Sequence, residues 1–219
     1  MQKLYGYRFE IILISQFLIL FGGLLFSAAW YNKYVSPVFF MANLFAGLLL
    51  FSRNKKKLGV IIALLFTALV TQIADNYSFK GEAFIRGLRL ASFFLFYILL
   101  TLELISQVWS AKIVSKNVIF GLISGYISLG LVGFFICLTI ESYHPNAFSG
   151  LTDSTVVTEE LIYYSYITLM TIGYGEIVPA IPSARKAAVF IGLLGQLYLV
   201  VLTAIIVGKY INQTALDKK

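Results

Sequence analysis

The sequence predicts an all-α integral membrane protein, with six transmembrane helices and a re-entrant helix and loop between the last two. Three observations favour this fold class. Of the 219 residues, 59% are hydrophobic and only 12% are charged, which leaves too little polar surface to cover a soluble globule. Apolar stretches long enough to cross a bilayer core of about 30 Å recur along the chain. A shorter apolar run, followed by glycine-rich sequence, separates the last two of these stretches.

Six apolar stretches define the predicted spans. They cover residues 11–30, 35–51, 58–74, 87–109, 118–140 and 184–211. The first four form a predicted N-terminal membrane unit over residues 1–110. The last two, with the segment between them, form a second unit over residues 111–219. Cys137 is the one cysteine of the chain, which excludes an intrachain disulfide and a cysteine metal cluster.

The re-entrant helix is predicted from an apolar run over residues 161–170 that is too short to cross a bilayer. Thr158 is its expected N-cap, because a threonine hydroxyl accepts hydrogen bonds from the free N–H groups of a first turn. Glu159 and Glu160 follow in that turn, where carboxylates suit the positive end of the helix dipole.

Charges predict the orientation of the chain. With both termini in the cytoplasm, 11 of the 17 basic residues lie inside and six lie outside, in agreement with the positive-inside rule. The loop between the last two spans then faces outward. The inner side includes a basic cluster, which serves either as a topology anchor or as a site for anionic lipid. Its members are Arg53, Lys55, Lys56 and Lys57.

The glycine-rich loop has the sequence TIGYGE over residues 171–176. Non-helical backbone exists at membrane depth only where it is buried in protein or lines a water-filled path. If residues 171–174 turn their carbonyls towards one axis, the backbone φ angles of consecutive residues alternate in sign. Glycine adopts a positive φ without a steric penalty. Such carbonyls replace the water shell of a cation, and the Thr171 hydroxyl adds a lower ring of oxygens. One loop cannot surround an ion, so a homotetramer with cyclic symmetry is expected.

The TIGYGE motif, preceded by the short apolar run and flanked by two membrane helices, resembles the selectivity filter of the potassium channels. The resemblance covers residues 118–211 and implies a pore domain with an outer helix, a pore helix, a selectivity filter and an inner helix. Glu176 departs mildly from the family, which usually has aspartate there. The six-span plan is similar to that of voltage-gated-type bacterial channels, and residues 1–110 resemble a degenerate voltage-sensor-like domain. The resemblance implies K+ coordination at Thr171, Ile172, Gly173 and Tyr174, with Gly175 completing the filter.

Side chains near the filter have two interpretations. The resemblance places Tyr163 and Tyr164 in an aromatic cuff that supports the filter, with Glu176 as a bonding partner, whereas the alternative is anchoring at the membrane interface. Ile167 stands where some relatives carry a glutamate, so the pairing of that glutamate with the acid after the filter cannot form here. Acidic residues of the outer loop, partly opposed by basic ones, give either a negative field that concentrates cations or an ordinary solvated loop. The acids are Glu141, Asp153, Glu159, Glu160 and Glu176, and the bases are Arg185 and Lys186.

The last span is expected to line the inner pore. Gly195 lies at the mid-helix position where many potassium channels have a gating glycine, and steps of four residues from it define a candidate lining face. The alternative to a hinge is that Gly192 and Gly195 are small residues for close helix contact. Gln196 either lines the cavity or bonds to the pore helix, and the sequence does not decide. The candidate lining is Gly195, Leu199, Thr203, Val207 and Ile211.

The fourth span carries a short basic series. Arg86 and Arg89 are three residues apart and share a helix face, as in a voltage sensor, but the next positions of the series carry no charge. We therefore expect weak or absent voltage dependence. The arginines are interpreted as reaching the lipid headgroups or as pairing with Asp75 or Glu82. Glu103, deeper in the span, should face protein or water, where it meets a basic partner or binds protons.

The expected function is that of a potassium-selective ion channel. It moves K+ passively through a plasma membrane, with no cofactor other than the permeant K+ ions and with no enzymatic or nucleic-acid-binding role. Eight residues follow Ile211, so no regulatory domain is expected there. The alternatives are a voltage-gated potassium channel, a filter-containing potassium uptake subunit and a non-conducting membrane scaffold. Uptake subunits carry four filter-like loops in one chain, whereas this chain has one.

Overall fold

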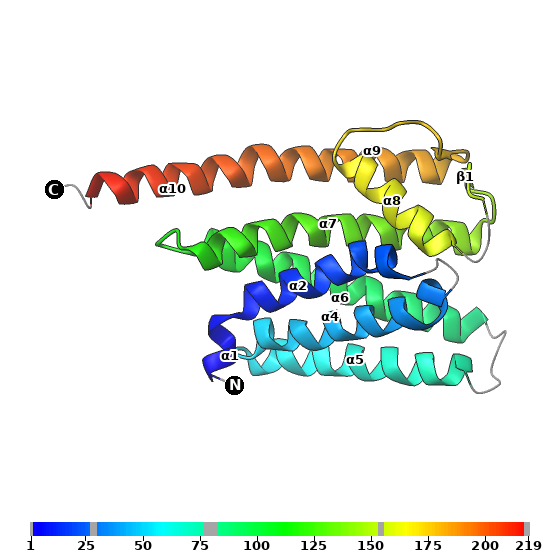
Figure 1. The fold of residues 1–219 in the computed structure, drawn as a ribbon, viewed down its shortest axis with the longest axis horizontal. Helices are drawn as coiled ribbons and strands as arrows, with labels where there is room; N and C mark the ends of the chain where they lie inside the picture. Colours follow the sequence, from blue (N-terminus) through cyan, green and yellow to red (C-terminus); the bar gives the residue numbers. More distant parts are fainter. Residues whose placement is uncertain (1, 27–29, 77–82, 153–155, 217–219) are drawn as a thin grey trace. The chain divides into compact units, whose positions relative to one another are not determined.

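The computed structural model describes residues 2–26, 30–76, 83–152 and 156–216, and most of them lie in helices (Figure 1). The chain divides into two compact units, Met1–Leu100 and Thr101–Lys219. The division falls inside α6 (Ala83–Trp109), and the domain boundary predicted at residues 110 and 111 stays a prediction. Two residues given roles above, Glu82 and Asp153, lie outside the described residues.

Five helices among the described residues are long and apolar enough to cross a membrane. The second predicted span corresponds to α4 (Ser36–Phe51), which has 16 residues and is shorter than the roughly 20 residues that a crossing helix needs. The helices therefore indicate a membrane protein, and the count of six spans stays a prediction. The five long helices are Arg8–Leu25, Lys55–Ala74, Phe84–Trp109, Lys116–Tyr143 and Pro182–Ala215.

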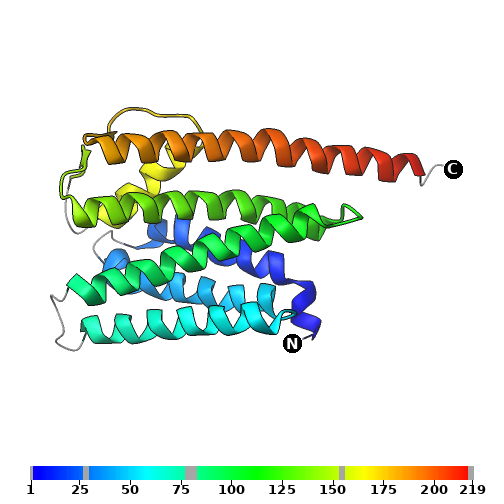
Figure 2. The same ribbon diagram turned by 180° about the vertical axis from the view of Figure 1, so that it is seen from behind.

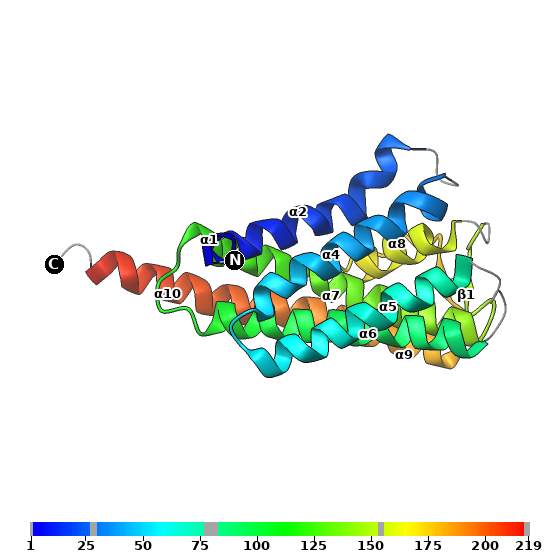
Figure 3. The ribbon, with the colours of Figure 1, turned by 90° about the horizontal axis from the view of Figure 1, so that it is seen from below.

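The first unit begins with α1 (Gln2–Gly6) and α2 (Arg8–Phe21), and a 3-10 turn, η1 (Gly22–Leu25), extends α2. A π-helical turn, η2 (Tyr31–Val35), leads into α4, and α5 (Lys55–Asn76) follows. α4 lies between α2 and α5 and packs on both (Figure 3). The order of these helices in space therefore follows their order in the sequence.

The interior of the first unit combines aromatic rings with a small polar cluster. Phe40 of α4 contacts the rings of Phe93 and Tyr97 on α6 edge to face, with centroid distances of 6.0 and 6.2 Å. On the same helix, the buried Asn43 donates a hydrogen bond of 2.8 Å to the hydroxyl of Ser15 on α2. Ring packing and neutral hydrogen bonds between helices therefore hold this unit together, as is common inside membranes.

The second unit consists of helices and a two-stranded sheet. α7 (Lys116–Tyr143) packs on α8 (Val157–Leu169), and both pack on α9 (Pro182–Leu197) (Figure 1). α9 continues through a π-helical turn, η3 (Tyr198–Leu202), into α10 (Thr203–Leu216). The resulting long helix runs beside α7, as the orange-to-red ribbon shows in Figure 2. This long helix, the inner helix, corresponds to the last predicted span.

α8 is the short helix that the sequence predicts between the last two spans, and its first turn contains Glu159 and Glu160 as expected. The prediction of Thr158 as N-cap is wrong. The N-cap is Val156, and no side-chain hydrogen bond caps this end of the helix. Because α8 begins at Val157, Thr158 lies inside the first turn, where its own N–H is among the groups that a helix start leaves free.

Candidate functional site

The segment that follows α8 folds back onto the end of that helix. The N–H groups of Ile172 and Gly173 both donate to the carbonyl oxygen of Ile167, at 2.8 and 3.3 Å. The N–H of Thr171 donates to the carbonyl oxygen of Thr168 at 3.0 Å. These bonds satisfy carbonyls that a helix end leaves free, and they fix the start of the TIGYGE loop on the last turn of α8.

Backbone conformation alternates along this loop. Positive φ angles occur at Thr171 (57°), Gly173 (56°) and Gly175 (94°), but not at the two residues between them. Alternation of left- and right-handed conformations aligns successive peptide groups, with N–H groups on one side and carbonyls on the other. A Cβ atom at Gly173 or Gly175 would meet no atom within 4 Å, so the positive φ, and not crowding, favours glycine there. The predicted alternation of backbone signs is confirmed.

The side chains of the loop are uncovered in the single chain. Tyr174 is 74% exposed and Ile172 is 45% exposed. Residues 171–176 are all classed with the exposed residues of the chain. Large apolar groups that stay uncovered beside a folded helix indicate a surface that contacts another molecule.

Tyr163 and Glu176 are joined across the loop by a hydrogen bond between the tyrosine hydroxyl and the glutamate carboxylate. This bond, with smaller contributions from desolvation and from the carboxylate charge, raises the pKa of Tyr163 to about 12. The physical cause is that loss of the proton would break the bond and place two negative charges together. The structure therefore brings together two of the three residues that the sequence suggests as filter supports.

Tyr164, the third of these residues, is buried and acts through a different contact. Its ring packs on Phe148 with a centroid distance of 5.0 Å, and burial raises the pKa of its hydroxyl. Phe148 belongs to β1 (Phe148–Ser149), which pairs antiparallel with β2 (Val178–Pro179) after the loop. Tyr164 therefore reaches the segment after the loop through the small sheet.

Two contacts that sequence reasoning missed also hold the segment after the loop. Gly150, with a φ of 96°, approaches Glu176 so closely that a Cβ atom would lie 2.0 Å from the Glu176 carbonyl oxygen. Arg185 of α9 donates to the carbonyl oxygens of Pro179 and Ala180, at 3.3 and 3.1 Å. An isolated glycine in the outer loop was the one sequence signal for the first contact. Nothing in the sequence pattern marks the second.

Two of the predicted outer acids stabilise the loop before α8. Glu141 accepts hydrogen bonds from the N–H groups of Asn146 and Phe148, at 2.7 and 3.1 Å. Glu160 accepts from the N–H of Thr152 at 3.0 Å and from its hydroxyl. Because these hydrogen bonds hold the two carboxylates in place, any negative electrostatic field that they add at the surface of the loop comes from fixed positions.

α8 is fastened to α7 by side chains that donate to backbone carbonyls. The Ser165 hydroxyl donates to Gly130 and the Tyr166 hydroxyl to Ile127, each at 2.6 Å. A Cβ atom at Gly130 would lie 2.4 Å from the Tyr166 ring, so the glycine makes room for that ring. Sequence reasoning identified neither bond, because donors and acceptors are 35 and 39 residues apart.

Comparison with protein families covers this part of the chain. Residues 122–212 match the model of a family described as "Ion channel". This segment is similar to the pore regions of that ion-channel family. It includes α8, the TIGYGE loop and most of α7 and of the inner helix, so the recognition of a potassium-channel-type pore domain is confirmed. No curated protein and no solved structure matches the chain.

The residues of the candidate lining differ in their exposure in the single chain. Leu199, Val207 and Ile211 are 46%, 49% and 61% exposed, and Thr203 is also exposed. Gly195 is buried, and a Cβ atom there would lie 2.2 Å from the carbonyl oxygen of Leu169 at the end of α8. This close approach supports the interpretation of Gly195 as a small residue for close helix contact, whereas its place on the lining face stays a prediction.

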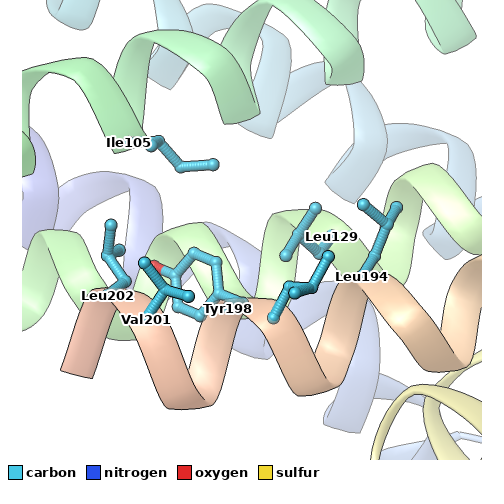
Figure 4. A pocket seen from close by; sticks show the side chains of 7 residues that line it. Ile105, Leu129, Leu194, Tyr198, Val201 and Leu202 are labelled. Atoms are coloured by element: carbon cyan, nitrogen blue, oxygen red, sulfur yellow. The ribbon is translucent and has the colours of Figure 1, made fainter. Parts of the chain in front are cut away.

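The second unit also holds an apolar cavity of about 320 Å³ beside η3 (Figure 4). Ile105 of α6 and Leu129 of α7 lie opposite side chains of the inner helix in this view. The one polar atom that the lining side chains carry, the Tyr198 hydroxyl, donates to the carbonyl oxygen of Leu122. The cavity therefore offers no polar group for catalysis. Its lining residues are Ile105, Leu129, Leu194, Leu197, Tyr198, Val201 and Leu202.

Proposed function

We propose that this protein is a potassium-selective channel that conducts K+ passively across a membrane as a homotetramer. The observation that carries the proposal is the alternating backbone of the TIGYGE loop at the end of α8, inside a segment that matches the ion-channel family. Carbonyl oxygens aligned on one side of such a loop replace the hydration shell of a cation. The residues that coordinate K+ in this proposal are Thr171, Ile172, Gly173 and Tyr174, and Gly175 completes the filter.

A tetramer follows from the chemistry of the loop. One loop offers oxygens to only one side of an ion, so a ring of copies around an axis is needed to complete the coordination. The exposed Ile172 and Tyr174 would then be covered by neighbouring subunits. The hydrogen bond between Tyr163 and Glu176 and the packing of Tyr164 on Phe148 would keep the loop at a fixed width.

In the proposed orientation, the protein lies in a plasma membrane with both termini in the cytoplasm and the TIGYGE loop on the outer side. The basic cluster of residues 53–57 would then face the anionic inner leaflet. Two arginines stack on one ring there, since the guanidinium groups of Arg8 and Arg53 lie 4.1 and 4.3 Å from the centroid of Tyr5. Lysines occupy the first turn of α5, where the positive end of the helix dipole opposes them and an anionic headgroup would relieve the repulsion. Anionic lipid is therefore the proposed partner of Arg53, Lys55, Lys56 and Lys57.

The experiment that tests this function is ion flux from liposomes that contain the purified protein. We expect flux of K+ and Rb+, little flux of Na+, and faster flux when the liposomes contain anionic lipid. Absence of flux, with a correctly assembled protein, would favour the membrane scaffold. A monomer that conducts would overturn the proposed filter, because one loop cannot surround an ion. Cross-linking and mass measurement of the purified protein distinguish a monomer from a tetramer.

A further inference from the structure

Two glycines of the inner helix lie against the end of α8, from which the TIGYGE loop starts. A Cβ atom at Gly195 would lie 2.2 Å from the carbonyl oxygen of Leu169, and one at Gly192 would lie 3.9 Å from that of Thr168. Small residues at such crossings allow two backbones to come close together. The backbone of the residue that follows Gly195 therefore lies near the first residue of the TIGYGE loop.

That residue is Gln196, and it reaches the loop. Its amide nitrogen Nε2 lies 3.5 Å from the hydroxyl oxygen Oγ1 of Thr171, a long hydrogen bond between residues 25 positions apart. Both side chains are exposed in the single chain. A primary amide carries donors on its nitrogen and an acceptor on its oxygen, whereas a hydroxyl has one donor and two acceptor sites. When the amide donates to Oγ1, the hydroxyl hydrogen of Thr171 is turned away from the amide and the rotation of the hydroxyl is restricted.

We propose that Gln196 is a positioning residue that orients the Thr171 hydroxyl for the innermost cation site of the filter. The inference rests on the proposed channel function. An amide donor on Oγ1 excludes the hydroxyl rotamer that points at the amide, restricts the rotation of the hydroxyl and leaves one lone pair for the cation. A ligand that is oriented before the ion arrives binds more tightly, because less freedom is lost on binding. Four copies of the pair would set the affinity of this site.

Barium block measures that affinity, because Ba2+ is a hard divalent cation that prefers oxygen ligands. The Gln196→Leu variant removes the amide but keeps a similar volume. We expect it to weaken Ba2+ inhibition of Rb+ flux about three- to tenfold, the range of one hydrogen bond. The Gln196→Glu variant should strengthen Ba2+ inhibition. A carboxylate accepts a hydrogen bond from the Thr171 hydroxyl and adds negative charge near the site. A merely structural role predicts that both substitutions change inhibition in the same direction.

A double-mutant cycle tests whether Gln196 acts through Thr171. In a Thr171→Ala background, the Gln196→Leu substitution should no longer change Ba2+ affinity. An equal effect of Gln196→Leu in both backgrounds, or no effect in either, would overturn the inference. If the unmodified protein shows no flux, the proposed function fails. The rise in thermal unfolding temperature on addition of Ba2+ to the purified full chain then measures the same affinities.

Discussion

Tyr174 has an exposed side chain on a backbone held between two glycines of positive φ. The charge of its ionised hydroxyl makes the smallest of the contributions that raise the pKa of Tyr163. In the proposed channel, the ring fixes the carbonyls of the outer filter at the distance that suits K+. We expect Tyr174→Asp to lower the preference for K+ over Na+ about tenfold, which corresponds to about 1.4 kcal/mol. Reversal potentials in mixed K+ and Na+ solutions measure this preference.

The matched control for this change is Tyr174→Phe. Phenylalanine keeps the ring and removes only the hydroxyl, so packing around the loop is largely retained. We expect its K+ preference to stay closer to that of the unmodified protein than to that of Tyr174→Asp. An unmodified protein without any K+ preference would contradict the proposed selectivity itself.

Thr171 is the non-glycine residue of the loop with a positive φ, at 57°. A residue with a Cβ atom adopts this conformation at some cost, so its hydroxyl is a candidate for a function that glycine could not provide. We expect Thr171→Cys to weaken Ba2+ block and to lower K+ occupancy at the inner end of the filter. The loss should be about tenfold or more, since a thiol is a poor ligand for hard cations. Thr171→Ser keeps the oxygen and should preserve most of the block, and unchanged block in Thr171→Cys would count against the site.

At the scale of secondary structure, the crossing of α8 and the inner helix depends on Gly195. Because a Cβ atom would lie 2.2 Å from the Leu169 carbonyl oxygen, Gly195→Ala must push the two helices apart. We expect the free energy of unfolding to fall by about 1–3 kcal/mol, the usual cost of overpacking. The control is Gly208→Ala on α10, where a Cβ atom would meet nothing within 4 Å. Thermal unfolding midpoints of the purified variants measure the difference.

The two variants separate the two interpretations of Gly195. If this glycine served only as a hinge, alanine there would leave the unfolding midpoint unchanged or raise it, because alanine favours helix more than glycine does. The Gly208→Ala variant should show that small rise in the unfolding midpoint. A fall confined to Gly195→Ala therefore supports close helix contact, and equal midpoints in the two variants would refute it.

The helices were easier to predict than the contacts between them. Apolar length alone placed the long helices, because a helix must match the thickness of the bilayer. The alternating backbone of the loop was predictable as well, since its glycines report the φ angles that the chain must adopt. The bonds from Ser165 and Tyr166 to carbonyls of α7 join distant parts of the chain and leave no local pattern. The contact of Gly195 with the end of α8 also joins distant parts of the chain, so the sequence left both interpretations of this glycine open.

At the scale of the whole molecule, the positions of the charged residues determine how strongly channel opening can depend on voltage. Arg86 is exposed and Arg89 is half-buried on α6. Further along this helix, Phe93, Phe96 and Tyr97 are buried. An arginine that moved inward along α6 would therefore leave water for a region of buried rings, at a cost of several kcal/mol.

Buried polar groups offer such an arginine little compensation. The buried polar residues described on α2 and α4 include Ser15, Gln16 and Asn43, which are neutral. Deeper on α6, the carboxylate of Glu103 accepts a hydrogen bond of 2.8 Å from the amide of Gln107, one turn further along the helix. This contact supplies Glu103 with a neutral donor on its own helix. The predicted basic partner of Glu103 and its proton binding stay predictions.

We therefore expect a channel that is largely independent of voltage. A membrane potential supplies about 2.3 kcal/mol per elementary charge per 100 mV, so an e-fold change in open probability within about 10 mV needs about 2.5 charges to cross the whole field. Planar-bilayer recordings between about −100 and +100 mV measure this dependence. The Arg86→Gln and Arg89→Gln substitutions together should leave it unchanged. An e-fold change within about 10 mV that these substitutions abolish would show instead that α6 is a voltage sensor.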